Sequence, residues 1–252
     1  MIATHKLTHM PADDIYLPVR VGNALSDEDY NYQGDDEGCN ISKKNPYFCE
    51  LTALYWGWKN LKNEYIGLVH YRRFFSVKKN IWKYSSVLNR REIEEILSTS
   101  DVVLPKKRNY YIETIYSHYM HTHNLEHLEI TRDILCLKYP EYVSSFDKIM
   151  KCRSAHMFNM LIMKKDILNN YCEWLFDVLF VLEKEIDVSC LAPFDARLFG
   201  RISELLLDVW IDKNKVKYVE TNFVQIGKIN TLNKIKGFLL AKFFGVKYTQ
   251  SR

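Results

Sequence analysis

Short apolar runs alternate along the chain with longer stretches in which apolar residues recur at helical spacing. The short runs predict strands, and the longer periodic stretches predict helices. The predicted strands cover residues 1–5, 15–21, 65–71, 101–105, 156–163 and 215–220. The predicted helices cover residues 45–62, 90–98, 113–138, 166–184 and 198–212. This alternation predicts an α/β fold with a mostly parallel central sheet.

Two further patterns divide the chain. The stretch 113–150 is predominantly helical and is expected to form an insertion beside the sheet. In residues 228–252, apolar side chains are interleaved with lysines, which predicts a basic amphipathic segment. We therefore expect one domain over residues 1–227, followed by a segment that either lies on an anionic membrane surface or packs on the sheet; we favour the membrane.

Composition sets broad limits. Hydrophobic residues make up 47% of the chain and charged residues 26%, as in a soluble globular protein. The net charge of +4 does not imply a nucleic-acid partner. The six cysteines are widely spaced, and the first residues lack the apolar core of a secretory signal, so we expect reduced thiols in the cytoplasm. GxGxxG, GxxxxGK[ST] and HExxH are absent, which argues against the usual dinucleotide, P-loop and zinc-protease classes.

Polar motifs follow two predicted strands. In an open α/β sheet, ligands bind beyond the carboxyl ends of the strands. The motifs at these ends are "THK", with Thr4, His5 and Lys6, and "HYRR", with His70, Tyr71, Arg72 and Arg73. We interpret both as parts of one site.

The two arginines of "HYRR" suggest an anion site. If the strand continues through residues 70–73, alternate residues face opposite sides of the sheet, which separates Arg72 from Arg73. Guanidinium groups bind phosphate oxygens in a bidentate manner, so the two could neutralise a diphosphate without a metal ion. The alternative is an ion pair with an acidic residue such as Glu50 or Glu204. We favour the anion site.

Acidic and histidine clusters offer alternative metal sites. The triplets Asp27-Glu28-Asp29 and Asp35-Asp36-Glu37 could hold Mn²⁺ or Mg²⁺, but both lie in a polar loop, and a solvated loop is favoured. Four histidines lie close together in sequence: His118, His121, His123 and His127. The last two could bind zinc from one helix face, but a third ligand is not evident and structural roles are favoured. His123 could instead line an acceptor cleft.

The segment 195–204 offers a general base. It carries Asp195, Arg197, Arg201 and Glu204 at helical spacing. A carboxylate in this segment could deprotonate an acceptor hydroxyl, or it could form an ordinary ion pair on a helix surface. Spacing alone does not decide between the two.

Several long motifs occur in a familiar order: "IYLPVRVGNALS", "GDDEGCNISKKNPYFCELTALYWGWKN", "YIGLVHYRRFF", "VLPKKR", "YPEY", "FNMLIMKKDILNNYCEWLFDVLFVLE" and "RLFGRISELLLDVW". Together they resemble the bacterial polysaccharide-biosynthesis family catalogued as domain of unknown function 4422. Its members resemble glycosyltransferases from capsule, exopolysaccharide and O-antigen clusters, some assigned to galactofuranosyl transfer. The similarity extends from Thr4 to about Asn222, although relatives usually carry a few more residues before "ATHK".

The resemblance implies a GT-A-like nucleotide-binding sandwich and a donor site. Residues 4–6 would contact the nucleotide, and Val21 and Gly22 would flank its base or ribose. The donor pocket would be shaped by Asn40, Ser42, Lys44, Asn45 and Glu50. Residues 70–73 would occupy the place where many such enzymes carry a metal-binding DxD motif. Our own inference, beyond the resemblance, is that Arg72 and Arg73 take the place of the metal. Glu204 is the first choice for the catalytic base and Asp195 the second.

The expected reaction is an inverting, metal-independent transfer from a UDP-sugar to a polyprenyl-linked glycan. UDP-galactofuranose and UDP-galactose are the donors implied by kinship. The expected location is the inner face of the cytoplasmic membrane, with residues 228–252 on its surface. A non-catalytic nucleotide- or carbohydrate-binding scaffold is the main alternative, and a zinc hydrolase is a third.

Overall fold

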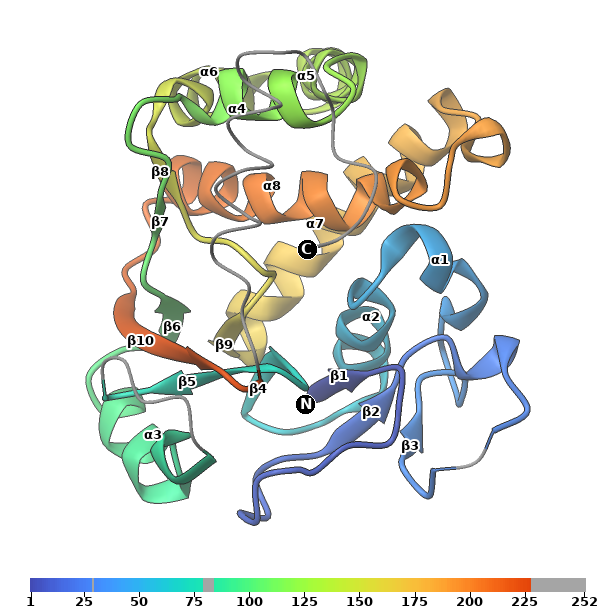
Figure 1. Ribbon diagram of the computed structural model, residues 1–252. Helices are drawn as coiled ribbons and strands as arrows, with labels where there is room; N and C mark the ends of the chain where they lie inside the picture. The colour runs from blue at the N-terminus through green and yellow to red at the C-terminus, as the bar shows by residue number, and fades with distance from the viewer. Residues whose placement is uncertain (29, 79–83, 228–252) are drawn as a thin grey trace.

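The computed structural model describes residues 1–28, 30–78 and 84–227 (Figure 1). Its main sheet contains β1 (Ile2–Thr4), β2 (Pro18–Arg20), β3 (Gln33–Gly34), β4 (Tyr65–His70), β5 (Arg73–Ser76), β6 (Val102–Pro105), β9 (Leu161–Lys164) and β10 (Val219–Gln225). A two-stranded ribbon contains β7 (Arg108–Asn109) and β8 (Ser154–Ala155). The helices are α1 (Asn45–Phe48), α2 (Leu51–Asn60), α3 (Arg90–Leu97), α4 (Ile115–Thr122), α5 (Glu126–Lys138), α6 (Val143–Lys151), α7 (Lys165–Glu185) and α8 (Leu198–Asn214). The predicted basic segment 228–252 lies outside the described residues.

The α/β class is confirmed, and the sheet is mixed, with two of its strands, β5 and β9, antiparallel to their neighbours. The strand order is β3-β2-β1-β4-β5-β10-β6-β9, and β9 also pairs with β4, so that five strands form a closed ring of pairings. The pairs β1–β2, β1–β4, β2–β3 and β6–β10 are parallel, whereas β4–β5, β5–β10, β6–β9 and β4–β9 are antiparallel. A tight turn after β4 explains the direction of β5, because strands joined by a two-residue turn must pair antiparallel.

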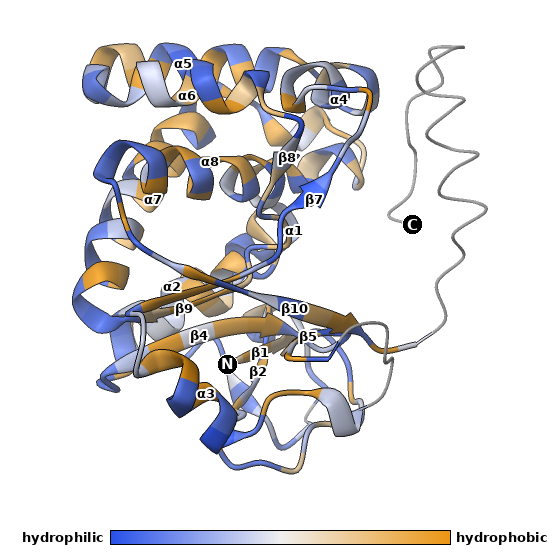
Figure 2. Cartoon of the chain, turned by 90° about the vertical axis from the view of Figure 1, so that its left-hand side faces the viewer, coloured by the Kyte–Doolittle hydropathy of each residue, from blue (hydrophilic) through white to orange (hydrophobic). Residues whose placement is uncertain are grey.

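The strands bury both of their faces. Ile2 and Val69 pack in one core, and their neighbours Ala3 and Leu68 pack in the other. This alternation follows from the period of two along a strand. Figures 1 and 2 show α7 and α8 on one side of the sheet and α3 on the other. The carboxyl ends of β1 and β4 therefore lie beneath the helical layer that contains α8.

The predicted insertion forms a separate helical layer. Helices α4, α5 and α6 lie beyond α8 in Figure 1, and α6 packs against α8. The predicted continuous helix over 113–138 is interrupted, because α4 ends at Thr122 and α5 begins at Glu126. The predicted helix 45–62 is likewise interrupted at Cys49, whose φ of 53° is not helical. Within the described ranges, every helix is too short or too polar to cross a lipid bilayer.

Candidate functional site

Ionisable side chains from four parts of the chain gather at the carboxyl end of β4. We call them the charged cluster: Glu50, His70, Arg73, Arg197 and Glu204. The Glu50 Oε1 atom lies 4.0 Å from His70 Nε2, and Arg73 interacts electrostatically with both glutamates. Arg197 is also coupled to both glutamates. The cluster therefore joins the sheet to α8 and to the turn between α1 and α2.

The "HYRR" motif is a hairpin turn and not a continuous strand. Strand β4 ends at His70, Tyr71 and Arg72 form the turn, and β5 begins at Arg73, which pairs with His70. The expected alternation of faces through residues 70–73 is therefore wrong. The two residues that the turn separates, His70 and Arg73, instead lie side by side at the edge of the charged cluster.

The two arginines of the motif have different surroundings. The Arg73 guanidinium lies 4.3 Å from the centre of the Phe158 ring, and its buried Nε makes no hydrogen bond within the described residues. Burial lowers the pKa of Arg73, while Glu204 and Glu50 oppose the shift. Arg72 Nε instead donates to the Ile226 carbonyl at 3.5 Å. Arg73 is thus the arginine of the motif that belongs to the charged cluster.

Glu204 has the properties of a general base. Burial raises its pKa to about 7, and the neighbouring Glu50 carboxylate adds to the shift. Arg73, Arg108 and the Phe158 amide oppose it. A carboxyl group with a pKa near the working pH can hold and release a proton, which is what base catalysis requires.

Strained backbone surrounds the two glutamates. Cys49, Phe158 and Asn159 have φ values of 53°, 76° and 52°, in a region that non-glycine residues seldom adopt. Asn159 Nδ2 donates to Glu50 Oε1 at 2.7 Å. Such strain persists where surrounding structure enforces it, and it is concentrated at functional sites.

The predicted nucleotide-contacting residues lie next to the cluster. Burial lowers the pKa of His5, and the charges of Lys6 and Arg197 lower it further. The His5 and Tyr71 rings are 5.1 Å apart, and Lys6 Nζ lies 5.2 Å from the Tyr71 ring centre. Thr4 is buried, and its hydroxyl donates to the Lys6 carbonyl at 2.7 Å. The structure therefore brings the "THK" and "HYRR" motifs together.

Asp195 and His123 are linked through Phe194 and Arg201, near the first turns of α8. The His123 ring is 5.9 Å from the Phe194 ring and 5.0 Å from the Tyr119 ring. Arg201 covers Phe194 at 4.1 Å and interacts electrostatically with Asp195. Asp195, which begins a 3₁₀ turn (Asp195–Arg197), thus belongs with the acceptor candidate His123.

The predicted base or ribose residues lie at the end of β2. The Val21 amide donates to the Thr4 carbonyl at 2.9 Å, which places it beside the "THK" motif. Gly22 has φ 69°, and a Cβ there would lie 2.8 Å from Asn45 Oδ1. Gly22 therefore permits both a left-handed turn and close contact with Asn45.

The remaining donor-pocket candidates have internal partners. Ser42 Oγ donates to Asp35 Oδ1, and Asn40 Nδ2 donates to the Asp36 carbonyl at 2.7 Å. Lys44 Nζ lies 2.5 Å from Glu183 Oε1. These contacts shape the loop before α1, and the ion pair directs Lys44 toward α7.

The acidic loop is also held by internal bonds. Asp35 is fully buried and accepts from the Gly22 and Asn23 amides at 2.9 and 3.0 Å. Asp36 Oδ1 accepts from the Asn23 side chain, Glu37 from Gln33, and Glu28 from Arg20. Asp29 lies outside the described residues. The second triplet, Asp35-Asp36-Glu37, thus organises the turn after β2.

The four histidines do not share one helix face, because His123 terminates α4 and His127 belongs to α5. Buried Glu113 accepts from His118 Nδ1 and His121 Nδ1 at 2.9 and 2.6 Å. Across residues 1–28, 30–78 and 84–227, three or more His, Cys, Asp or Glu side chains nowhere gather as a metal site.

A second ionisable group lies one helical turn further along α8. His156 is fully buried, its Nδ1 pairs with Asp208 Oδ1, and its Nε2 lies 2.9 Å from Glu220 Oε1. The His156 amide also donates to Asp208, at 2.9 Å. We call these three residues the histidine lock, because they join β8, α8 and β10.

Phe158, Asn159 and Arg108 were not predicted as parts of the site. The first two lie within the run "HMFNMLIM", which reads as one strand. The only signal there was a polar asparagine inside an apolar run. Arg108 follows a predicted strand, but its neighbours Lys106 and Lys107 make it resemble a surface charge.

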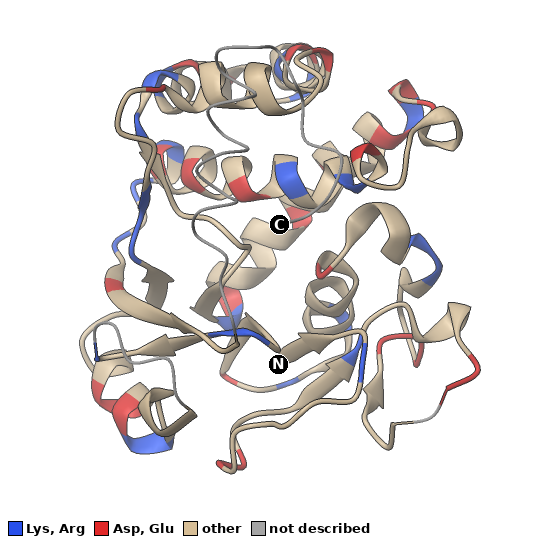
Figure 3. Cartoon of the chain, in the orientation of Figure 1, with Lys and Arg blue, Asp and Glu red and all other residues tan. Residues whose placement is uncertain are grey.

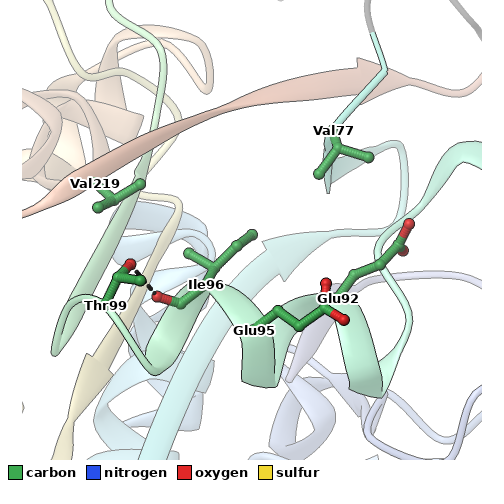
Figure 4. A pocket seen from close by; sticks show the side chains of 6 residues that line it. All are labelled: Val77, Glu92, Glu95, Ile96, Thr99 and Val219. Carbon is green, nitrogen blue, oxygen red and sulfur yellow. Dashed lines mark hydrogen bonds between the residues drawn. The ribbon is translucent and has the colours of Figure 1, made fainter.

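A shallow hollow of about 390 Å³ lies elsewhere, between α3 and the ends of β5 and β10 (Figure 4). Glu92 and Glu95 line it together with apolar side chains. Glu92 caps α3 through Asn89, and Glu95 pairs with Arg91. These carboxylates have local structural partners, so the charged cluster is the stronger candidate site.

Comparison with known proteins identifies the family and the fold. Residues 1–215 match the model of the family described as Domain of unknown function (DUF4422). Among solved structures, the apo structure of the bifunctional glycosyltransferase WbbM is similar, with a TM-score of 0.83 and 30% sequence identity. The match covers 90% of this chain but 45% of that one. A search of curated proteins finds no match. The family resemblance drawn from the motifs is confirmed, and the fold is similar to that of part of this solved glycosyltransferase.

Proposed function

We propose that this chain, which belongs to the DUF4422 family, transfers a sugar from a UDP-sugar to a hydroxyl of a polyprenyl-linked glycan during synthesis of a surface polysaccharide. The observation that carries the proposal is the charged cluster, in which Arg73 and Arg197 lie with Glu50 and Glu204 on a glycosyltransferase fold. A cationic group for the leaving diphosphate and a base for the acceptor are the two parts that such a reaction needs.

The donor would bind in a GT-A-like manner at the carboxyl ends of β1, β2 and β4. Its diphosphate would lie near Lys6, Arg73 and Arg197. Departure of UDP concentrates negative charge on the phosphate oxygens, and fixed guanidinium groups stabilise that charge where it develops. Because Arg73 Nε makes no hydrogen bond within the described residues, this donor group can still be satisfied by an anion. We propose that these cations act without a metal ion.

Glu204 would remove the proton of the acceptor hydroxyl while the anomeric bond breaks. This is a single displacement, so the product has inverted anomeric configuration. The acceptor would approach from the side of His123 and Asp195. Galactose, as furanose or pyranose, is the sugar to test first, because the family resemblance includes galactofuranosyl transfer.

The test is UDP release by the full chain, with a panel of UDP-sugars and a lipid-linked glycan acceptor. We expect Arg73→Ala to lower kcat by about 10²- to 10³-fold, as for loss of a group that stabilises the departing charge. Arg132→Ala is the matched control, because Arg132 pairs with Asp147 in the helical layer. Its activity should equal that of the unchanged chain.

Three outcomes would contradict parts of the proposal. UDP binding without turnover would favour the non-catalytic scaffold. Loss of activity in EDTA with recovery in manganese would show that a metal ion, and not the arginines alone, neutralises the negative charge of the leaving diphosphate. Retained anomeric configuration in the product would remove Glu204 from the role of base.

A further inference from the structure

Four exposed large hydrophobic side chains lie in α4 and in the turn immediately before it. Tyr111 is 79% exposed and Ile112 62%, in the turn that precedes α4. Tyr116 and Met120, each 39% exposed, follow at a spacing of four residues on the helix itself. We call these four residues the α4 patch. A group of large apolar side chains in water usually marks a binding surface.

Tyr111 has an unfavourable backbone conformation although its side chain is exposed to solvent. Tyr111 has a φ of 56°, which a tyrosine rarely adopts. Its side chain is exposed and so gains little from the interior. The neighbouring Ile112 is exposed as well, so the turn presents two adjacent apolar groups to the outside.

The β7–β8 ribbon places basic residues beside this turn. Arg108 pairs with Ala155, and the Tyr110 amide donates to the Arg153 carbonyl at 2.8 Å. Arg153 Nη1 in turn donates to the Tyr111 carbonyl at 3.5 Å. The exposed Lys151 ends α6 immediately before this segment.

Acidic residues are scarce in the segment that carries the patch. Between residues 106 and 125 the sequence contains one acidic residue, Glu113, which is only 3% exposed. In Figure 3 the segment of β7 is coloured for Lys and Arg. The exposed charged residues of this segment and of the β7–β8 ribbon are therefore basic, and the partly exposed Asp147 of α6, which interacts with Lys151, is paired with Arg132.

We propose that the α4 patch and the basic residues Arg108, Lys151 and Arg153 bind an anionic membrane surface. Tyrosine and aliphatic side chains insert at the level of the headgroups, and lysine and arginine attract anionic lipids. A protein partner would not require the scarcity of acidic groups. The lipid surface explains the apolar and the basic residues together.

The location of the surface suits the proposed reaction. Arg108 lies 5.3 Å from the Tyr110 ring centre and interacts electrostatically with Glu204. The membrane-binding surface and the charged cluster thus meet at Arg108. This consequence rests on the proposed function, because it would bring a lipid-linked acceptor to the base. Membrane binding itself does not depend on catalysis.

The test is co-sedimentation of the full chain with vesicles of phosphatidylcholine alone or mixed with phosphatidylglycerol. We expect binding to the anionic vesicles that weakens as salt is raised. Replacing the patch with polar residues (Tyr111→Asn, Ile112→Ser, Tyr116→Gln and Met120→Gln) should lower vesicle affinity at least tenfold. Asparagine is chosen at 111 because it tolerates a positive φ. Lys151→Gln with Arg153→Gln should lower affinity by about fivefold for each charge.

Leu137→Gln is the matched control, because Leu137 is an 85% exposed apolar residue on α5. Its vesicle affinity should be unchanged, and circular dichroism should show all variants folded. Equal vesicle binding by the patch variant and the unchanged chain would overturn the proposal, as would no binding to anionic vesicles. A change in oligomeric state in place of vesicle affinity would assign the patch to a second copy of the chain. Turnover on a water-soluble acceptor should persist in the patch variant, so loss of membrane binding and loss of catalysis are distinguishable.

Discussion

The charged cluster and the histidine lock are built from neighbouring segments, but their polar groups differ in how many hydrogen-bond partners they have. Glu204 and Asp208 lie one turn apart on α8, and His156 precedes Phe158 and Asn159 by two or three residues. In the lock, both ring nitrogens and the amide of His156 have carboxylate partners. In the cluster, Arg73 Nε has no hydrogen bond in the described part of the chain, and the pKa of Glu204 is raised to about 7.

This difference in hydrogen bonding indicates that the histidine lock is structural and that the charged cluster is functional. Buried polar groups in native proteins are nearly always hydrogen-bonded, so a satisfied cluster contributes to holding the fold together. An unsatisfied cation beside a carboxyl group with a perturbed pKa is expected where a ligand completes the set. Changes in the lock should therefore affect stability, and changes in the charged cluster should affect catalysis.

The largest effect is expected from Glu204→Gln. Loss of the base should lower kcat by about 10²- to 10⁴-fold in the UDP-release assay. Activity of the unchanged chain should fall as the pH drops below about 7, because Glu204 then holds a proton. A variant with unchanged kcat and pH profile would show that another group removes the acceptor proton.

The same substitution should not destabilise the fold. In the native state the pKa of Glu204 is raised from 4.5 to about 7, so the native state binds the proton more tightly than the unfolded state does. This contribution to stability is present at low pH and is lost as the pH rises from 4.5 to 7. Glutamine does not ionise, so Glu204→Gln removes the cost of a buried negative charge at high pH. The substitution should therefore raise the free energy of unfolding at pH 8 by about 1–3 kcal/mol. Urea unfolding at pH 5 and pH 8 measures the change.

His156→Ala should have the next largest effect, on stability. It removes the ring that hydrogen-bonds to Asp208, which is 3% exposed, and leaves only the backbone amide of residue 156 and Lys107 near that carboxylate. Removing one partner of a buried hydrogen bond costs about 1–3 kcal/mol, measured by urea unfolding. Arg90→Ala is the control, because its pair with Asp14 is exposed to solvent and should contribute little to stability. A loss from His156→Ala no larger than the control would mean that the lock does not hold the elements together.

Glu220→Gln should have the smallest effect. Glu220 is 34% exposed, and glutamine keeps an oxygen that can accept from His156 Nε2. We expect the free energy of unfolding to change by no more than about 1 kcal/mol and kcat to stay the same. A loss as large as that of His156→Ala would show that the lock requires both negative charges.

Much of the fold can be predicted from the sequence, but the tight turn after β4 and the helix break at Cys49 cannot. Strands and helices with clear periodicity were predicted near their observed positions. Strand β5 was missed because the turn at Tyr71 and Arg72 contains no glycine, asparagine or proline, the usual signals of a tight turn. The break at Cys49 was missed for the same reason. The turn at Tyr71 and Arg72 sets β5 antiparallel to β4, whereas the break at Cys49 divides a helix and does not affect the sheet.

The candidate site was predicted in part. Glu204 and the arginine motif were recognisable because charged residues directly follow or enter apolar elements. The pairing of Glu50 with Asn159 was not predictable, because the two residues are 109 positions apart and meet through a strained turn. The relation of Lys44 to Glu183 likewise depends on tertiary contacts between α7 and the loop before α1.

Helix α8 carries polar groups along its whole length. Arg197 immediately precedes the helix, Glu204 and Asp208 lie near its middle, and Asp212, which accepts from Ser145 and Lys148 of α6, lies near its end. A rotation of this helix about its axis would carry all of these side chains away from their partners in concert. A displacement of α6 would therefore act, through Asp212, on the helix that carries Glu204.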